Sequence, residues 1–544
     1  MLAQSVPQGD AMKTRLLTIC CCVGVLLPAC FSPSRFVEPA GAAEVAKVFG
    51  DHMVLQQGMP VPIFGKAADG EKVTVTFGDQ TKSVVATDGK WQVKLDALSV
   101  SKVPQTLSVA GGGKAVELTD VLVGEVWLGS GQSNMAGRAS SYAKRDPKLA
   151  ELAAKQSFPM IRLNMGGKWS TADKENVGKF SALCFAFGER LQRELDVPVG
   201  LMVGAVGGTP SGFWVQPDSF KVSERCRVEI DAAMAEYDAD AAKRQYEKQL
   251  AAYQKVVADA KAAGKKARGR APKMNEGPGT TSRAGEIGNL YQKHIEPLVG
   301  YGIRGVLWDQ GEARSGVHGV TQYTMMCELI ESWRGVWQQG DFPFLFVQKP
   351  SGGGAAFDRS NPITNKGEVF ATALPKAPTG NTSKHRERWL DRYMYVRLMH
   401  DNANAWMVPA IDLGTTIHPT NKWGYGNRSA EVALSQTYKD GTQAYGPSYQ
   451  SNKATGKKVR LQFDQVGKGL TTAHSETLQG FALADKSGRW HWATASIEGD
   501  EVVVWSDDVP EPTKVSYAYA NTRRWANLYN KDGLPALSFI DDVK

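Results

Sequence analysis

The chain has 544 residues, of which 42% are hydrophobic and 22% charged, the composition of an ordinary globular protein of several domains. This composition excludes an intrinsically disordered chain, a collagen and a long coiled coil. The formal net charge is +8, but the densest basic run, residues 261–273, lies in an Ala/Gly/Pro-rich stretch that we interpret as a solvated segment. We therefore expect no nucleic-acid partner.

The first residues have the order of an export signal. Basic residues precede an apolar run from Leu16 to Leu27, and small residues follow at positions 40–43, as in a signal peptide with its cleavage site. We assign residues 1–43 to this signal, with Met12 as the start, and expect a periplasmic or extracellular protein. Lipoprotein anchoring at Cys30 is the alternative. The apolar run is too short to span a bilayer, so we expect no transmembrane span.

Cysteine usage argues against a disulfide framework or a metal site. Beyond the leader, only Cys184, Cys226 and Cys327 remain, so at most one disulfide can form. The sequence contains no CxxC pair and no HExxH motif, which are the usual signatures of zinc sites.

Hydrophobic patterning divides the rest of the chain into three parts. Residues 44–120 alternate apolar and polar residues, which predicts a small antiparallel β module. Residues 121–434 instead contain unbroken apolar runs separated by helical periodicity, which predicts α/β architecture with a parallel sheet and flanking helices. Short strands return over residues 435–544 and predict a second antiparallel β module. The apolar runs are Val121–Leu128, Val199–Val206, Ile303–Trp308, Phe344–Val347 and Trp406–Ala410.

Two helical features lie between these runs. Phe180, Leu183, Phe187 and Leu191 recur at helical spacing and place one apolar stripe on a helix. A long insertion over residues 222–283 interrupts the α/β pattern. Its apolar residues again fall at helical spacing, so we expect a helical hairpin or arm followed by a polar Gly/Pro loop.

Residues able to carry chemistry follow four of the predicted strands. Ser133, Gly208, Gln310 and His418 each come shortly after an apolar run, and ligands of such sheets bind at the carboxyl ends of the strands. Each residue taken singly also fits a capping loop, a turn, a loop amide or a surface histidine. Together they predict hydrolytic acyl transfer, because a serine nucleophile needs a base and its oxyanion needs prearranged donors.

A family resemblance is carried by many short blocks in one order. The chain resembles the sialate O-acetylesterases of the SGNH hydrolase superfamily, a group that also contains acetylxylan-type esterases with the same serine loop. The blocks are Phe49-Gly50-Asp51-His52-Met53-Val54-Leu55-Gln56, Gly124-Glu125-Val126-Trp127, Gly131-Gln132-Ser133-Asn134-Met135, Gly207-Gly208-Thr209-Pro210, Trp308-Asp309-Gln310-Gly311-Glu312, Phe342-Pro343-Phe344, Val347-Gln348, His418-Pro419, Asn421-Lys422 and Asn527-Leu528-Tyr529-Asn530.

The resemblance implies an SGNH-hydrolase-like parallel sheet and release of acetate from an O-acetylated glycan, without a metal or other cofactor. By matching position it implies that Ser133 is the nucleophile and His418 the base. The oxyanion hole then consists of the N–H groups of Ser133 and Gly208 and the side-chain amide of Gln310. An acetylxylan-type carbohydrate acetylesterase and a non-catalytic glycan-binding protein with a decayed site are the alternatives, and the oligomeric state stays open.

Departures from the family pattern concern the group that orients His418. Thr415 and Thr416 occupy the positions where such enzymes commonly carry an Asp. The imidazole must then be oriented by Glu312, by Asp412, by a backbone carbonyl or by no ionised group, and we favour Glu312.

Further departures lie around the expected sugar pocket. Asp309 replaces the usual Tyr, and Ala313-Arg314 replaces the usual Ser-Asn. We assign Asp309, Arg314 and Trp214 to substrate binding, with Trp214 as a platform for a sugar face.

Overall fold

The computed structural model describes residues 43–267, 269–378, 391–519 and 523–544. The predicted export signal, including Met12 and Cys30, lies outside these ranges except for residue 43. Within them, no helix has the length and apolarity needed to cross a membrane. The same ranges contain no group of three or more His, Cys, Asp or Glu side chains placed to hold a metal ion.

The N-terminal part consists mainly of antiparallel strands, as the alternating pattern predicts, while β2 pairs parallel with β8. Strands β1, β3 and β6 form one sheet, and β4, β5, β7 and the first half of β8 form a second ladder. The strand bounds are β1 (Glu44–Val45), β2 (Val54–Gln56), β3 (Val61–Lys66), β4 (Lys72–Phe77), β5 (Gln80–Val85), β6 (Lys90–Leu95), β7 (Ser101–Gly111) and β8 (Lys114–Gly131).

Strand β8 continues without a break from this module into the central sheet. Its first seven residues alternate between exposed and half-buried positions, whereas the residues from Val121 to Gly131 are all buried. The change at Val121 follows the change in sequence pattern, because the second half of β8 is covered on both faces. The boundary predicted between residues 120 and 121 therefore falls inside one strand.

The central sheet has the order β10-β9-β11-β8-β12-β13-β14. All neighbours from β9 to β14 run parallel, and only β10 pairs antiparallel with β9. The five predicted apolar runs are the five strands β8, β11, β12, β13 and β14, and the hairpin β9-β10 adds to them. The new bounds are β9 (Ser157–Met165), β10 (Lys168–Asp173), β11 (Val199–Ala205), β12 (Gly305–Asp309), β13 (Phe344–Val347) and β14 (Ala405–Val408).

Strand β8 lies where the order of the parallel sheet reverses. The chain leaves β8 and returns as β11 on one side, and it later returns as β12 on the other side. Loops that follow the strands at such a switch point diverge and leave a crevice for a ligand. The loops after β8, β11 and β12 carry Ser133, Gly208 and Gln310, so the topology brings three of the predicted site residues to one edge of the sheet.

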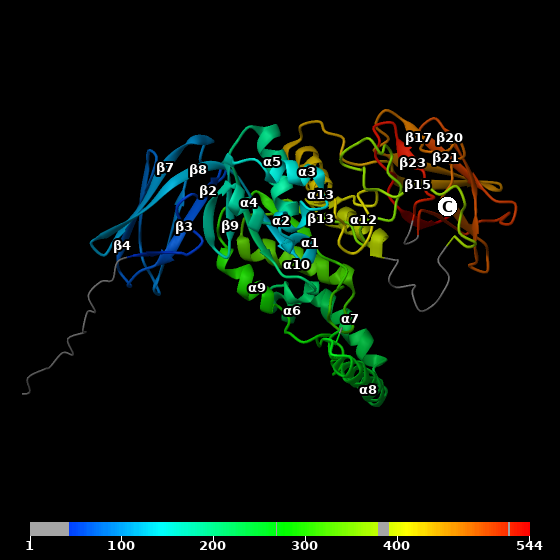
Figure 1. Cartoon of the computed structure of the whole chain (residues 1–544), viewed down its shortest axis with the longest axis horizontal. Coiled ribbons are helices and arrows are strands. Elements are labelled where there is room, and N and C mark those ends of the chain that lie inside the picture. Colours follow the sequence, from blue (N-terminus) through cyan, green and yellow to red (C-terminus); the bar gives the residue numbers. More distant parts are fainter. Residues whose placement is uncertain (1–42, 268, 379–390, 520–522) are drawn as a thin grey trace, which may run out of the picture. The chain divides into compact units, whose positions relative to one another are not determined.

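Helices flank this sheet, with α5 and α13 packed against each other and α10 packed against α12. Figure 1 shows α5 and α13 on one side of the strands and α9 and α10 on the other. The predicted apolar stripe lies on α5, where Ser181 caps the helix by accepting from the Cys184 N–H. The helix bounds are α1 (Ser133–Ala136), α2 (Ala139–Tyr142), α3 (Pro147–Ala153), α4 (Lys174–Lys179), α5 (Ala182–Leu195), α6 (Pro217–Val222), α9 (Asn289–His294), α10 (Gln322–Trp337), α12 (Asp391–Asp401) and α13 (Lys422–Ala433).

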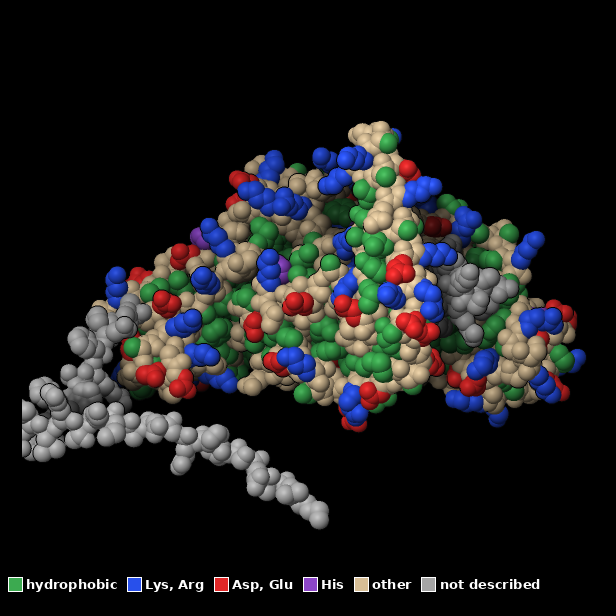
Figure 2. All heavy atoms as spheres, turned by 90° about the horizontal axis from the view of Figure 1, so that it is seen from below, with side chains coloured by type: hydrophobic (Ala, Val, Ile, Leu, Met, Phe, Trp, Pro, Cys, Tyr) green, Lys and Arg blue, Asp and Glu red, His purple; other side chains and the backbone are tan. Residues whose placement is uncertain are grey.

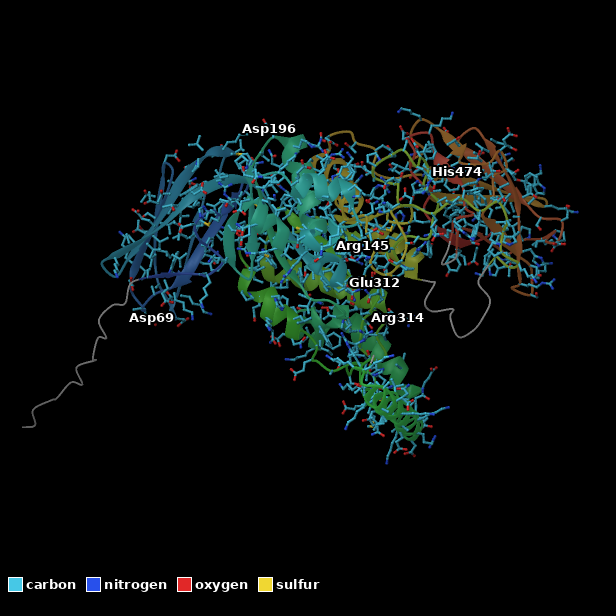
Figure 3. The ribbon with its side chains drawn as sticks, in the orientation of Figure 1. Asp69, Arg145, Asp196, Glu312, Arg314 and His474 are labelled. Atoms are coloured by element: carbon cyan, nitrogen blue, oxygen red, sulfur yellow. The ribbon has the colours of Figure 1, made fainter. Side chains whose placement is uncertain are left out.

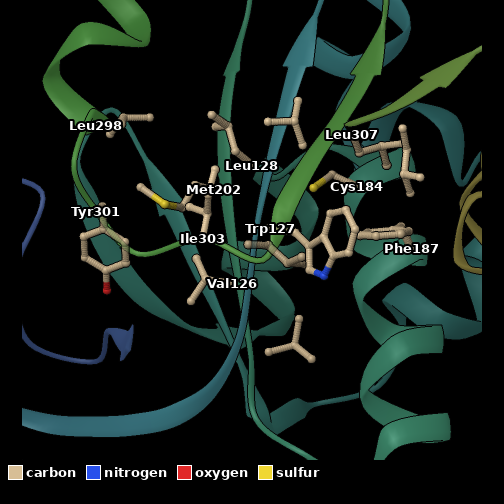
Figure 4. Packing of buried hydrophobic residues seen from close by; sticks show 14 of the residues in the cluster. Val126, Trp127, Leu128, Cys184, Phe187, Met202, Leu298, Tyr301, Ile303 and Leu307 are labelled. Atoms are coloured by element: carbon tan, nitrogen blue, oxygen red, sulfur yellow. The ribbon is translucent and has the colours of Figure 1, made fainter. Parts of the chain in front are cut away.

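The hydrophobic core lies between β8, its neighbouring strands and these helices. Trp127 of β8 packs with Phe187 of α5, whereas its neighbour Leu128 points to the other face of the sheet; all three are fully buried (Figure 4). The Trp127 and Phe187 rings meet edge to face, with their centroids 5.1 Å apart. Burial of these side chains fixes β8 and therefore the start of the loop that carries Ser133.

The insertion forms two helices, α7 (Glu224–Ala235) and α8 (Ala239–Ala262). Helix α8 has no buried residue, and Figure 1 shows it apart from the sheet. Residues 263–267 and 269–288, which precede α9, are irregular. On the face shown in Figure 2, Lys and Arg side chains are interspersed with Asp and Glu.

The C-terminal part is again antiparallel. It consists of the sheet β15-β16-β21-β20, the pair β17-β23 and the sheet β19-β18-β22-β24, so the predicted α/β class with two antiparallel β modules is confirmed. The bounds are β15 (Ser448–Thr455), β16 (Lys458–Asp464), β17 (Leu470–Thr472), β18 (Phe481–Ala484), β19 (Trp490–Trp492), β20 (Thr494–Glu498), β21 (Glu501–Trp505), β22 (Lys514–Tyr517), β23 (Leu528–Asn530) and β24 (Phe539–Asp542).

Candidate active site

Ser133 and His418 lie in contact although 285 positions separate them in the chain. The Ser133 hydroxyl oxygen Oγ is 2.8 Å from Nε2 of His418, a normal hydrogen-bond distance. Ser133 is half-buried at the start of α1, and His418 is exposed on the loop between β14 and α13. A serine hydroxyl in this contact can pass its proton to the imidazole, which is the arrangement that nucleophilic catalysis needs.

The turn that carries Ser133 is fixed by Gly131. This glycine has φ +126, and a Cβ on it would lie 2.3 Å from the carbonyl oxygen of Asp309 on β12. The next residue, Gln132, donates its backbone N–H to the same Asp309 oxygen at 2.9 Å. The close approach of β8 and β12 therefore requires glycine here, and it turns the chain so that Ser133 begins a new helix.

The turn after β11 lies directly beside the serine. A Cβ built on Gly207 would be 3.5 Å from Cβ of Ser133, and Gly208 has φ +72. Among the residues that the structure describes, neither the Ser133 nor the Gly208 backbone N–H has a hydrogen-bond acceptor. These two donors remain available for the negatively charged oxygen of a tetrahedral intermediate.

Asn134 connects the serine loop to the histidine loop. Its buried amide Nδ2 donates to the Ile417 carbonyl at 3.2 Å, one residue before His418. Nδ2 also donates to Oε1 of Glu312 at 3.1 Å, and Oδ1 accepts from Nζ of Lys422 at 2.6 Å. Because one side chain contacts both loops, it holds Ser133 and His418 at a fixed separation.

Asn421 holds the same loop at its other end. Its buried side chain donates to the Ile363 and Leu413 carbonyls at 2.7 and 3.1 Å and accepts from the Gly424 N–H at 3.0 Å, capping α13. Between Leu413 and Asn421, Thr416 has a positive φ of 74°, uncommon for a β-branched residue. The loop conformation before His418 is therefore set by hydrogen bonds at both ends.

Glu312 lies on the serine loop and not on His418, which corrects the predicted orienting role. Its carboxylate accepts from the side-chain amides of Gln132 and Asn134, the two neighbours of Ser133, and pairs with Lys349 at 3.1 Å. No contact joins it to His418 among the residues described. Figure 3 shows Glu312 near Arg314, on the same loop after β12.

A buried cluster of charges lies behind the serine loop. Asp309 and Lys349 are both buried and pair at 2.5 Å. Burial raises the pKa of Asp309. Burial alone would lower the pKa of Lys349, but the carboxylates of Asp309 and Glu312 raise it above its ordinary value. Lys422 is also fully buried, and desolvation lowers its pKa to about 7 despite the attraction of Asp309.

Asp412, the alternative orienter of His418, is equally committed elsewhere. It is fully buried and accepts two hydrogen bonds from the Arg428 guanidinium, at 3.2 and 3.1 Å. In the described part of the chain, Nδ1 of His418 has no hydrogen-bond partner. Neither Glu312 nor Asp412, the two carboxylates that the sequence offered, therefore contacts His418 among the residues described.

Gln310 does not present its amide to the serine, contrary to the predicted oxyanion role. The side chain is fully buried, and Nε2 donates to the Thr209 and Arg314 carbonyls, each at 3.2 Å. Its Oε1 accepts from Gln322 at 3.3 Å. Both amide hydrogens are used to join the loops after β11 and β12, so Gln310 braces the site from behind.

Two predicted sugar contacts are wrong because the side chains are buried. Trp214 is fully buried, donates to Oγ1 of Thr209 at 3.0 Å and meets Trp308 edge to face, so it has no face to offer a sugar. Asp309 is taken up by the ion pair with Lys349. Arg314 is half-buried with a positive φ of 55°, and its assignment to substrate binding stays a prediction.

Several residues of this site escaped the sequence reasoning although their signals were present. Gln132 and Asn134 flank the predicted nucleophile, and Lys422 follows the His418-Pro419 block in the motif. Lys349 comes two residues after the apolar run Phe344–Val347. The rule that chemistry follows each buried strand therefore applies to β13 as well, and it would have selected Lys349.

Comparisons with known proteins fit this geometry. Residues 123–271 match the family model described as carbohydrate esterase, sialic acid-specific acetylesterase. This range includes Ser133 and Gly208, while His418 lies beyond it. Sialate O-acetylesterase of Homo sapiens is 27% identical over 344 residues, covering 56% of this chain and 57% of the human protein. That of Mus musculus is 27% identical over 352 residues, covering 56% of this chain and 60% of the mouse protein.

The similarity to a solved structure extends over more of the chain. A carbohydrate acetylesterase from Xanthomonas citri superposes with a TM-score of 0.69 at 25% identity, covering 92% of this chain and 99% of that one. The match to the curated relatives spans little more than half of their length. Residues 123–271 are therefore similar to the sialic acid-specific acetylesterase family of carbohydrate esterases, which confirms the resemblance indicated by the motifs of the chain.

Proposed function

We propose that this protein is an exported esterase that removes acetyl groups from O-acetylated sugars through an acetyl-enzyme on Ser133. The observation that carries the proposal is the 2.8 Å contact between Oγ of Ser133 and Nε2 of His418. The family model and the Xanthomonas citri relative support acetyl esters of carbohydrates as the substrate class. Sialic acid is the proposed sugar, because the matching family model is sialic acid-specific.

Acylation begins when Nε2 of His418 accepts the proton of Ser133 and Oγ attacks the acetyl carbonyl carbon. The carbonyl π electrons move to oxygen, and the N–H groups of Ser133 and Gly208 donate to the oxyanion. When the oxyanion collapses, the bond to the sugar oxygen breaks, and His418 gives that oxygen its proton. The products of this half-reaction are the free sugar hydroxyl and an acetyl ester on Ser133.

Deacylation repeats these steps with water as the nucleophile. His418 accepts a proton from water, the hydroxide oxygen bonds to the acetyl carbon, and the ester bond to Oγ of Ser133 breaks. The proton returns to Oγ, and acetate leaves. Because only neutral imidazole can accept a proton, we expect the rate to fall as the pH is lowered.

The position of His418 is maintained in this scheme by its loop. Asn134 donates to the Ile417 carbonyl directly before His418, and Asn421, which follows His418 in the chain, donates to the Leu413 carbonyl at the start of the loop. These contacts are neutral hydrogen bonds to the backbone. They hold the ring near Ser133 in a part of the chain where no described carboxylate reaches Nδ1.

Acetate release from p-nitrophenyl acetate and from O-acetylated sialic acid tests the proposal. We expect Ser133→Ala and His418→Ala each to lower kcat by at least about 10³-fold while the melting temperature stays close to wild type. Full turnover by Ser133→Ala would overturn the assignment of the nucleophile. Sugar binding by a wild-type protein that releases no acetate would favour the non-catalytic glycan-binding alternative.

Acetylated xylan serves as the comparison substrate for the sugar itself. Faster release of acetate from xylan than from acetylated sialosides would favour the acetylxylan-type alternative. Export is tested separately, by sequencing the N-terminus of the mature protein from cells of its source. We expect it to begin near residue 44, after the predicted signal.

A further inference from the structure

Two arginines from the inserted segment reach the turn beside Ser133. Arg270 donates from Nη1 to the Gly208 carbonyl oxygen at 3.3 Å, and Arg283 donates from Nη1 to the same oxygen at 3.1 Å. Gly208 is the neighbour of Gly207, which packs on Ser133. The segment after α8 belongs to the insertion and not to the central sheet. It nevertheless places two guanidinium groups at the edge of the site.

Neither guanidinium is neutralised by the part of the protein that the structure describes. No carboxylate oxygen among those residues lies within the ion-pair distance of 4.0 Å of Arg270 or Arg283. Their common acceptor is one uncharged carbonyl, which can take only a small share of the donors that two guanidinium groups carry. Desolvation and then the charge of Arg270 lower the pKa of Arg283, as expected for like charges held together without a counter-ion.

The remaining donors are accessible. Arg270 is exposed and Arg283 is half-buried, and neither carries a buried nitrogen that lacks a partner. Two cations placed side by side, with free N–H groups and an opening to solvent, form a binding site for an anion. A planar guanidinium matches a carboxylate in particular, because two parallel N–H groups meet two oxygens.

We propose that Arg270 and Arg283 bind the carboxylate of an acidic O-acetylated sugar, so that the inserted segment makes the enzyme prefer anionic substrates. This inference rests on the proposed function, since the carboxylate must belong to a sugar whose acetyl group reaches Ser133. Sialic acids and uronic acids both carry such a group. The insertion would thereby select for acidic sugars and would contribute nothing to the binding of neutral acetylated sugars.

The kinetic test compares an O-acetylated sialic acid, an O-acetylated galacturonic acid and the carboxyl methyl ester of each. We expect wild type to show a kcat/KM at least about tenfold higher for each acid than for its methyl ester, mainly through KM. In Arg270→Ala/Arg283→Ala the advantage disappears, whereas Arg270→Lys/Arg283→Lys keeps part of it. Lys265→Ala, an exposed cation on the same segment, should keep the wild-type ratio.

Activity on p-nitrophenyl acetate, which carries no carboxylate, distinguishes loss of carboxylate recognition from damage to the Gly208 turn. For the double alanine variant, we expect the loss on the acids to exceed any loss on p-nitrophenyl acetate by at least about tenfold. Equal losses on both would overturn the proposal, because the arginines would then merely support the Gly208 turn. Equal kcat/KM of wild type for acid and methyl ester would overturn it as well. An advantage for only one acid would identify which sugar the site takes.

A binding measurement keeps this test independent of catalysis. Calorimetric titration of Ser133→Ala with N-acetylneuraminic acid, with galacturonic acid and with their methyl esters reports charge recognition without turnover. We expect at least one acid to bind about tenfold or more tightly than its ester, and the double arginine substitution to abolish the difference. If wild type releases no acetate but this preference is present, the esterase proposal fails while the anion site stands. No preference would refute the site.

Discussion

Glu312 determines where Ser133 lies by accepting from the residues on either side of it. Replacing it by Ala removes the acceptor of both amides and leaves Lys349 with one counter-ion fewer. We expect Glu312→Ala to lower kcat by about 10- to 100-fold, since hydrogen bonds to a charged group contribute about 1.5–3 kcal/mol each. Glu312→Gln, which keeps an oxygen acceptor, should recover part of the loss.

The pH profile distinguishes this positioning role from the orienting role first predicted. A carboxylate that stabilises the protonated imidazole would shift the acidic limb of kcat/KM when removed. Because Glu312 contacts the serine loop and Lys349 but not His418, we expect the limb of Glu312→Ala to coincide with that of wild type. A clear displacement of the limb would show that Glu312 acts on His418 after all.

Lys422 links folding stability to pH. Burial lowers its pKa to about 7 in the folded protein, whereas an unfolded lysine titrates near 10.4. Between these values the unfolded chain holds a proton that the folded chain has released, so stability rises with pH. We expect the free energy of unfolding of wild type, relative to Lys422→Gln, to increase by up to about 1.4 kcal/mol per pH unit between about pH 7 and pH 10.

Urea unfolding of both proteins at several pH values measures this difference. Lys94→Gln, at an exposed position of β6, is the matched control and should track wild type throughout. A constant difference between wild type and Lys422→Gln across the range would mean that Lys422 keeps its proton in the folded state.

Site residues could be predicted from the sequence where one short motif indicates both the chemistry of the side chain and its place after a buried strand. Ser133 and His418 follow buried strands, and each is the proposed reactive residue of its own block. Gln310 and Trp214 follow strands as well, but whether such a side chain faces the crevice or the interior depends on partners in other loops. Thr209 accepts from Trp214 and, through its carbonyl, from Gln310, and no local pattern announces these contacts.

Among the elements, the loop between β14 and α13 depends on one capping residue. Asn421→Ala removes the hydrogen bonds to the Ile363 and Leu413 carbonyls and the N-cap of α13. We expect a loss of about 1–3 kcal/mol in the free energy of unfolding. Because His418 lies on this loop, kcat should fall together with stability.

Asn421→Asp separates the two effects. Aspartate keeps an acceptor for the Gly424 N–H but cannot donate to the carbonyls, so it should restore the cap and not the loop. We expect stability closer to wild type with kcat still reduced. An Asn421→Ala protein with wild-type kcat would show that the loop needs no such support.

Strand prediction succeeded where burial on both faces coincides with apolar residues. Strand β13 has the bounds that its apolar run predicts, and β11 differs by one residue. The hairpin β9-β10 was missed because β9 buries polar side chains at Arg162 and Asn164. Arg162 is stabilised there by Asp120, the half-buried residue directly before the buried half of β8, a contact that no local pattern reveals.

For the whole molecule, one hydrophobic cluster joins the N-terminal strands to the central sheet, while most of the C-terminal strands form another. We expect calorimetry to show two unfolding transitions, one for each cluster. Leu107→Ala and Leu128→Ala, at fully buried positions of the first cluster, should both lower the same transition. Leu461→Ala, in the second cluster, should lower the other, each substitution costing about 2–5 kcal/mol.

Matched substitutions make the result interpretable, since all three replace a fully buried leucine. A third transition that responds only to Leu107→Ala would mean that the N-terminal strands unfold independently. The sequence pattern alone suggested that independence, because periodicity changes at residue 121. Hydrophobic periodicity indicates which faces of a strand are buried. It does not indicate whether the same strand continues where the pattern changes.

The continuity of β8 has a consequence for inheritance and for engineering. A recombination point between residues 120 and 121 would cut the strand that leads into Ser133, so we expect that the N-terminal strands cannot be exchanged as a separate unit. A chimaera with a relative must therefore take the whole of β8 from one parent, together with the strands that pair with each half of β8. Lineages that retain the serine should accordingly retain this module too, whatever they do with the C-terminal one.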